Sequence, residues 1–133
     1  MIFGVGIDIE EHHRFLKYLN SQTNSQKSLS VYSDKELENY KAYNTHLCFA
    51  ISFSCKEAFF KAFGQTWANS PLQWDDIEII FNDIPENKNV EVLLSGYAQE
   101  LMQKYKIDSK IEFDYDISDT SIVFKTILTC QKK

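Results

Sequence analysis

The sequence lacks a long apolar run: no segment approaches the roughly 20 consecutive apolar residues that a membrane-spanning helix needs. It also lacks an excess of positive charge, and its formal net charge of −5 argues against nucleic-acid binding. The chain opens directly on a predicted strand, without the basic and then apolar segments of a signal peptide. We therefore expect a soluble cytoplasmic protein that binds neither membranes nor nucleic acids.

Cysteine and histidine are both scarce, with three copies of each. Cys48, Cys55 and Cys130 form an odd number without the spacing of metal ligands, and the first two are predicted to pack as buried thiols. Two of the histidines, His12 and His13, are adjacent and would point to different faces of a helix. We therefore do not expect a zinc site there.

The chain shows no repeat and no linker, and its 44% hydrophobic content suffices for a core, so residues 1–133 are predicted to be one domain. The hydrophobic pattern predicts an α+β fold in which a small antiparallel sheet packs on a long buried helix. The expected elements are a strand at 2–10, helices at 11–19, 33–43 and 49–64, strands at 77–81 and 90–94, a helix from Ser95 to about Lys106, a hairpin of strands at 110–117 and 122–129, and loops at 20–30 and 64–71.

Two of the short helices carry specific signals. In the helix at 11–19, Phe15, Leu16 and Leu19 are expected to point inward. The next helix begins with a predicted capping box, in which Ser33 is the N-cap residue and Glu36 the third helical residue.

The segment at 49–64, FAISFSCKEAFFKAFG, is apolar on nearly every face yet carries three charges in its middle. Such a helix should be buried, and full charges are rarely buried unless they are paired or bound to a metal. Glu57 and Lys61 lie about 40° apart and Lys56 about 100° from Glu57, so one ligand could meet all three. The alternative is an ordinary Glu57–Lys61 ion pair on a solvated stripe.

Residues 2–10, IFGVGIDIE, alternate strictly, as the residues of a strand do. Glycines inside a strand usually mark a place where another backbone packs closely. If the buried helix lies against the glycine face, Glu57 meets the carboxylates of the strand; the alternative is an edge strand with an acidic end. One face carries Phe3, Val5, Ile7 and Ile9, and the other carries Gly4, Gly6, Asp8 and Glu10.

Three converging carboxylates require a cation, because like charges at close range cannot all stay ionised. Oxygen-only ligation favours a hard ion such as Mg²⁺, which keeps several waters and commonly binds substrate phosphates. A neighbouring lysine supplies the positive charge that phosphate chemistry requires. The two segments therefore predict a magnesium site made by Asp8, Glu10 and Glu57, with Lys61 beside it.

These two segments resemble the signature motifs of the 4′-phosphopantetheinyl transferases. VGIDIE at 5–10 is similar to the family's glycine-containing strand that ends in Asp, and FSCKEAFFKAFG at 53–64 is similar to its Lys-Glu-Ala helix. YSDKEL at 32–37 looks like the family's short helix before that motif, and Arg14 stands where an arginine often follows the Asp strand. The length of 133 residues resembles the short holo-acyl-carrier-protein synthase type, whereas Asp8-x-Glu10 looks more like the metal pair of the longer type.

The resemblance implies an enzyme that transfers the 4′-phosphopantetheine group of coenzyme A to a serine of an apo acyl carrier protein and releases 3′,5′-ADP. It implies that Asp8 and Glu57 hold Mg²⁺, with Glu10 bound directly or through water. Glu57 or a water on the metal would remove the serine proton, and Lys61 would stabilise the leaving group.

The resemblance also implies a set of binding residues and an assembly. A single unit supplies only part of the cleft, so the short type is expected to form a homotrimer. Arg14 and Lys17 are the expected basic patch that docks the acidic carrier protein. The residues expected to bind coenzyme A are Lys56, Lys61, Gly64 and Lys88.

The sequence departs from the family pattern in the region expected to meet the nucleotide. The family has a Gly-Lys-Pro turn, a Ser-x-Ser-His segment and a basic residue before the Lys-Glu pair. This chain has other residues in their place, which removes positive charge and hydrogen-bond donors. A catalytically weak homologue that binds a carrier protein or a partner subunit is therefore the alternative, and another Mg²⁺-dependent phosphotransfer enzyme is a third possibility. The departing residues are Ser52, Asn87-Lys88-Asn89 and Asp116-Ile117-Ser118-Asp119.

Overall fold

A computed structural model of the chain describes residues 1–19, 31–66 and 70–131. The predicted loop at 20–30 lies outside the described residues, as does part of the one at 64–71. In the described parts, no helix has both the length and the apolar character needed to cross a membrane. The elements in chain order are β1 (Ile2–Glu11), η1 (His12–Leu19), α2 (Asp34–Lys41), α3 (His46–Ala62), η2 (Trp74–Asp76), β2 (Ile77–Phe81), η3 (Pro85–Asn87), β3 (Val90–Leu94), α4 (Gly96–Lys104), β4 (Glu112–Ile117) and β5 (Ser121–Thr129).

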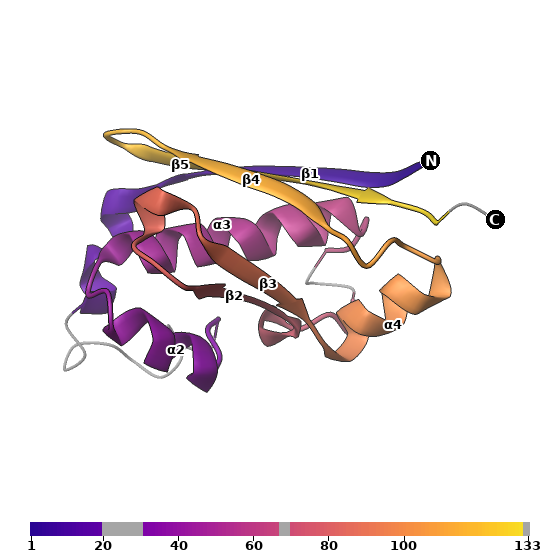
Figure 1. Cartoon of the computed structure of the whole chain (residues 1–133), viewed down its shortest axis with the longest axis horizontal. Coiled ribbons are helices and arrows are strands. Elements are labelled where there is room, and N and C mark those ends of the chain that lie inside the picture. Colours follow the sequence, from indigo (N-terminus) through magenta and orange to yellow (C-terminus); the bar gives the residue numbers. More distant parts are fainter. Residues whose placement is uncertain (20–30, 67–69, 132–133) are drawn as a thin grey trace.

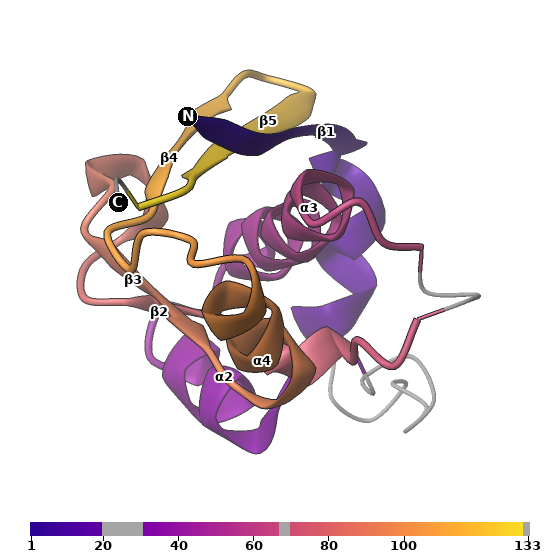
Figure 2. The ribbon, with the colours of Figure 1, turned by 90° about the vertical axis from the view of Figure 1, so that its right-hand side faces the viewer.

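The predicted α+β architecture is confirmed, but with two antiparallel sheets in place of one. One sheet has three strands in the order β1-β5-β4, and β2 pairs with β3 in a second sheet. Figure 1 shows the three-stranded sheet running along one side of α3, with the β2–β3 pair on another side. Figure 2, turned by 90°, shows α3 beneath the three-stranded sheet. The long helix is therefore the centre of the fold.

The long helix α3 is buried along most of its length, as its apolar composition predicts. It begins earlier than expected, at His46, because the side chain of Thr45 caps its first turn. It ends where predicted: Gly64 adopts a left-handed conformation with φ 69°, and its N–H donates to the Lys61 carbonyl at 3.0 Å. Glycine favours this helix-ending geometry because it has no Cβ.

Strand β1 packs its glycine face directly against the backbone of α3. A Cβ atom placed on Gly4 would lie 1.9 Å from the carbonyl oxygen of Ala62, and one on Gly6 would lie 1.7 Å from that of Ala58. No side chain larger than hydrogen fits at either position. The close backbone contact that the two glycines predict is therefore confirmed.

The opposite face of β1 is apolar and exposed. Val5, Ile7 and Ile9 are 49%, 51% and 65% exposed, respectively. The same outer face extends onto the other two strands, because Ile9 pairs with Val123 of β5 and Val123 pairs with Asp116 of β4. It is apolar on β1 and becomes acidic on β4. The sheet thus turns its glycines and carboxylates toward the helix, and part of its apolar surface toward solvent.

The first short helix, η1, is a 3₁₀-helix, which changes the residues that face inward. The expected burial is confirmed for Phe15, which is 3% exposed, but is wrong for Leu16 and Leu19, which are 48% and 39% exposed. In a 3₁₀-helix, residues three apart share one face. His12, Phe15 and Tyr18 therefore form the inward side.

The remaining predicted elements agree with the structure. The capping box of α2 is present: Glu36 N donates to Ser33 Oγ at 3.1 Å, and Ser33 N donates to Glu36 Oε1 at 3.1 Å. Strands β2 and β3 have the predicted bounds, and β4 pairs with β5 as the expected hairpin. Local periodicity and turn residues thus predict most of the elements around the helix.

We expect Gly6→Ala to destabilise the fold strongly, because its methyl group would overlap the carbonyl of Ala58. Overpacking costs about 1–3 kcal/mol, and we expect a loss at or above the upper end because the obstacle is backbone. Gly64→Ala is the control: a Cβ there meets nothing within 4 Å, so only left-handed strain of about 1–2 kcal/mol is added. Urea unfolding would contradict the packing argument if the two variants lost equal stability.

Candidate active site

Asp8 and Lys61 meet where β1 lies against α3. The Lys61 Nζ donates to Asp8 Oδ1 at 3.2 Å and to the backbone carbonyl of Ile7 at 2.9 Å. The Asp8 side chain is 8% exposed, whereas that of Lys61 is 50% exposed. The acid is therefore held inside the fold, while the amine lies at the surface where a ligand can reach it.

The second carboxylate oxygen of Asp8 is an orphaned polar atom. Asp8 Oδ2 is buried and has no hydrogen-bond partner among the described residues. Burying a carboxylate oxygen without a partner is costly. A hard cation, or a water bound to one, is a suitable partner for this atom.

Glu10 and Glu57 add two carboxylates to the surroundings of Asp8. Burial, together with hydrogen bonding to Asp8 and the charge of Asp8, raises the pKa of Glu10 to about 8, against the opposing charge of Arg14. Burial and the charge of Asp8 also raise the pKa of Glu57, against the opposing charges of Lys61 and Arg14. The three acids therefore interact, and a cation among them would favour their ionised forms.

This carboxylate cluster fits an ion that keeps much of its own water. Among the described residues, only three histidines bring three possible metal-ligand atoms within 4.8 Å of one another. The carboxylates of Asp8, Glu10 and Glu57 are spread more widely, so they do not enclose an ion by themselves. Mg²⁺ usually retains several waters and binds one or two protein carboxylates. Asp8 and Glu57 can supply those two, whereas Glu10 is already engaged by Arg14.

Arg14 links the carboxylate cluster to η1. Its guanidinium pairs with Glu10 and lies 4.9 Å from the ring centre of Phe15 and 5.4 Å from that of Phe53. Arg14 and Lys17 line one small hollow of about 130 Å³. The two residues predicted to dock a carrier protein thus share a surface that adjoins the carboxylates.

Lys56 takes no part in this cluster, and the expectation that it binds coenzyme A is wrong. Its side chain is fully buried, and its Nζ lies 2.8 Å from Glu36 Oε1. The same Nζ also donates to the backbone carbonyls of Trp74, at 3.0 Å, and Ile77. An ammonium group has three hydrogens, and these three acceptors use all of them.

Glu36, which the sequence indicated only as a capping residue, is the buried partner of Lys56. Its carboxylate accepts hydrogen bonds from α2 and its N-cap residue, from α3 and from β2, so the charge is fully satisfied. Ser52 is one of these donors, at 2.9 Å, and it is buried. The expectation that Ser52 faces the coenzyme A region is therefore also wrong. The donors are Ser33 N, Tyr40 Oη, Ser52 Oγ, Lys56 Nζ and Ile79 N.

Gly64 ends the helix that carries Lys61, whereas Lys88 lies apart from the carboxylate cluster in the single chain. A Cβ on Gly64 would meet nothing within 4 Å, so its role in the fold is the left-handed end of α3. Lys88 lies beside β4, where its Nζ donates to Asp114 Oδ1 and Asp116 Oδ1, each at 3.2 Å. Because β5 separates β4 from β1, this group is on the opposite edge of the sheet from Asp8.

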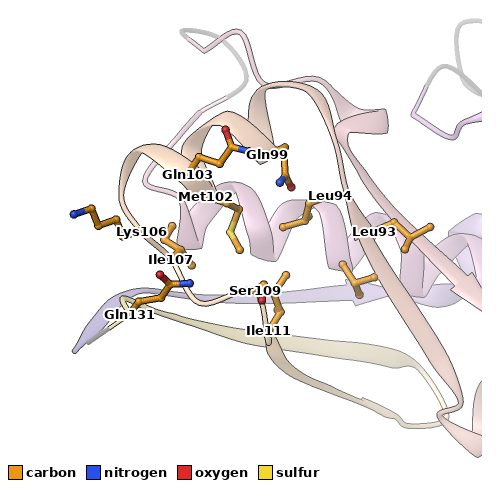
Figure 3. A pocket seen from close by; sticks show the side chains of 11 residues that line it. Leu93, Leu94, Gln99, Met102, Gln103, Lys106, Ile107, Ser109, Ile111 and Gln131 are labelled. Atoms are coloured by element: carbon orange, nitrogen blue, oxygen red, sulfur yellow. The ribbon is translucent and has the colours of Figure 1, made fainter. Parts of the chain in front are cut away.

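A groove of about 500 Å³ opens elsewhere, between β3, α4 and the segment at 107–111 (Figure 3). None of the site residues predicted from the sequence is among the described residues that line it. Its lining combines apolar side chains such as Met102 with amides such as Gln99, and Lys106 stands at one side. The groove therefore lacks the acidic groups that would hold a hard metal ion.

Comparison with known sequences gives a family match that covers both motifs. The model of the 4′-phosphopantetheinyl transferase superfamily matches residues 4–114. A holo-[acyl-carrier-protein] synthase of Geotalea daltonii is 36% identical over 103 residues, which are 76% of this chain and 78% of the relative.

Comparison with solved structures shows the same fold. The holo-[acyl-carrier-protein] synthase of Neisseria meningitidis superposes with a TM-score of 0.77 at 19% identity, over 97% of this chain and 99% of that one. A Bacillus anthracis holo-(acyl-carrier-protein) synthase in complex with CoA (3′,5′-ADP) superposes with a TM-score of 0.71 at 22% identity, over 98% of this chain and 99% of that one.

We expect Lys56→Met to destabilise the protein far more than Lys61→Met. Removing Lys56 leaves the buried Glu36 carboxylate without its counter-ion, which should cost about 3–5 kcal/mol. Removing the half-exposed Lys61 should cost less than about 1 kcal/mol. Urea unfolding measures both, and adding Glu36→Gln to Lys56→Met should recover part of the loss. A Lys56→Met protein as stable as Lys61→Met would contradict the structural role of the buried pair.

Proposed function

The chain belongs to the 4′-phosphopantetheinyl transferase superfamily, and we propose that it is a holo-[acyl-carrier-protein] synthase. It transfers the 4′-phosphopantetheine group of coenzyme A to a serine of an apo acyl carrier protein and releases 3′,5′-ADP. The observation that carries this proposal is the meeting of the Asp strand with the Lys-Glu-Ala helix, which sets Asp8 against Lys61. Both motifs lie within the region matched by the family model.

The carboxylates at this junction support a dependence on Mg²⁺. Asp8, through its unpartnered Oδ2, and Glu57 would hold the ion, with Glu10 bound directly or through water. The ion would neutralise negative charge on the pyrophosphate of coenzyme A. A cytoplasmic location, like the dependence on magnesium, stays a prediction.

Lys61 and Glu57 are the residues with direct chemical roles in this proposal. Two of the three ammonium hydrogens of Lys61 bond to Asp8 and Ile7, so the third can bind a phosphate oxygen and stabilise the leaving 3′,5′-ADP. Glu57 is half-buried beside the cluster, and a carboxylate in this position is a candidate general base. It would take the proton of the attacking serine hydroxyl.

The second half of the cleft is proposed to come from another copy of the chain. Lys88 pairs with Asp116 on the outer face of the sheet, whereas Asp8 faces α3, so a second copy is the expected source of a Lys88 and an Asp116 beside the Asp8 of the first. The exposed apolar face of β1, with Ile7 at its centre, offers a surface for assembly. We therefore propose a homotrimer with one cleft at each subunit boundary.

The second candidate function, a catalytically weak homologue that binds a carrier protein, is favoured by one observation. Lys88, which remains from the family's Gly-Lys-Pro turn, is held by Asp114 and Asp116. Asp116 stands where the family has a hydroxyl residue, so the charge available to a coenzyme A phosphate is reduced. Carrier binding without any transfer would identify this second function.

We expect Asp8→Asn to lower the transfer rate by about 100-fold or more while the fold survives, because it removes a ligand charge from the metal site. The assay incubates the protein with coenzyme A, Mg²⁺ and apo carrier proteins and measures the mass gained by the carrier. Glu11→Gln, the same type of change on an exposed residue of β1, is the matched control and should keep the wild-type rate. An Asp8→Asn variant with wild-type rates at limiting Mg²⁺ would refute the site.

We expect Ile7→Glu to convert a trimer into monomers, because a charge at the centre of an apolar interface cannot be desolvated cheaply. Leu16→Glu places the same charge on a residue of similar exposure, 48% against 51%, outside the sheet and should stay trimeric. Light scattering coupled to size-exclusion chromatography measures both. A monomeric wild type at micromolar concentration would contradict the proposed assembly.

A further inference from the structure

All three histidines of the chain converge at one point, although they come from distant parts of the sequence. His12 and His13 begin η1, and His46 is the first residue of α3, 34 positions after His12. One ring nitrogen from each lies within 4.8 Å of the other two. We propose that these three imidazoles form a binding site for a divalent transition-metal ion of the zinc type, separate from the carboxylate cluster.

The hydrogen bonds of His12 leave its Nδ1 ready to bind a metal. Its Nε2 lies 2.9 Å from the backbone carbonyl of Ser118, which can only accept, so Nε2 carries the proton. Nδ1 of the neutral ring then carries the lone pair, which accepts a hydrogen bond from His46 Nε2 in this structure. In metal-binding histidines, the ring nitrogen that does not bind the metal usually donates its N–H to a backbone carbonyl or carboxylate, which fixes the tautomer and the ring orientation. The ring is also held in place by burial, since His12 is 5% exposed.

The second ligand atom already stands close to the position that a tetrahedral site requires. His46 Nε2 lies 3.0 Å from His12 Nδ1. Two nitrogens on one tetrahedral zinc ion, each about 2.0–2.1 Å from it, are about 3.3 Å apart. A shift of a few tenths of an ångström would therefore exchange the histidine–histidine hydrogen bond for two bonds to one metal ion. Burial and the neighbouring histidines lower the pKa of His46, which favours the neutral form that binds metals.

His13 supplies the third ligand from the exposed side. Its ring stacks on that of His46 with centroids 5.8 Å apart and lies edge-on to that of His12 at 4.5 Å. It is exposed to solvent, so it can turn toward an ion without disturbing the core. Three histidines with a water in the fourth position are an established arrangement for zinc.

The histidine site differs from the carboxylate cluster in both chemistry and place. Imidazole nitrogens select ions such as Zn²⁺, Ni²⁺ and Cu²⁺, whereas carboxylates suit Mg²⁺. His46 precedes Glu57 by eleven residues on α3, which corresponds to about 16 Å along the helix axis. The site lies at the end of the molecule where η1, the first turn of α3 and the β4–β5 turn come together (Figure 1). A metal there would fasten η1, the segment that carries Arg14, to the rest of the fold.

The sequence alone argued against this site because an α-helix would point adjacent histidines to different faces. The approach of His46 from another helix changes that result, because its ring lies against the rings of both His12 and His13. The competing explanation is that His12 and His46 form only a hydrogen bond that joins η1 to α3. The two explanations differ in whether zinc binds and stabilises the protein.

The test is titration of the full chain, without a histidine tag, with Zn²⁺ by calorimetry in excess Mg²⁺, together with Co²⁺ absorption and thermal unfolding. We expect one zinc ion per chain, a tetrahedral Co²⁺ spectrum and a higher Tm with zinc. His13→Asn, chosen because His13 is exposed, should weaken zinc binding about tenfold or more and leave the metal-free Tm unchanged.

Two control variants address the other ligands. Cys130→Ser removes the least buried thiol, and Asp8→Asn alters the carboxylate cluster; both should bind zinc as the wild type does. If the wild type binds no zinc, or if His13→Asn and His46→Gln both bind it as tightly as the wild type, the histidines form only a hydrogen bond and the proposal fails. Loss of zinc binding in Cys130→Ser or Asp8→Asn would also overturn it. Because zinc binding is measured without carrier protein or coenzyme A, these outcomes are independent of transferase activity.

Discussion

The close contact between β1 and α3 is the constraint on which the rest of the structure depends. Gly4 and Gly6 have no Cβ, so the backbone of the strand rests directly on helix carbonyls. At that separation the buried Asp8 carboxylate is within hydrogen-bonding distance of Lys61, and its charge acts on Glu57. A larger side chain at either glycine would hold the strand farther out and separate the acid from the lysine. The glycines therefore contribute to function through distance, without contacting a ligand.

A second interaction sets the rotation of α3. Lys56 and Glu57 are consecutive, so their side chains leave the helix about 100° apart. The buried ammonium of Lys56 is held by Glu36 of α2 and by backbone carbonyls around β2. With Lys56 fixed on that side, Glu57 and Lys61 must face β1. The most buried charge of the helix thus acts as a positioning group for its neighbours, and its removal would leave the partner acid uncompensated.

The sequence predicted what depends on local pattern and did not predict what depends on distant partners. Strand alternation and two interior glycines predicted the contact between β1 and α3, because both are properties of a short segment. The role of Lys56 depends on Glu36, which belongs to another helix, and no local pattern in the sequence indicates that these two residues pair. The histidine convergence was missed because it needs a third residue, His46, which lies far along the chain and approaches from another helix. Metal dependence and assembly stay predictions, since both concern groups outside a single chain.

The strict alternation of β1 connects the two proposed properties of this protein. Asp8 faces the helix because the residues on either side of it, Ile7 and Ile9, face outward. One register therefore presents the carboxylate to the inside and an apolar stripe to the outside. A slip of one residue would exchange the faces, burying the isoleucines against helix carbonyls and exposing the acid. A strand paired in this register therefore both buries Asp8 against the helix and exposes the apolar stripe to solvent.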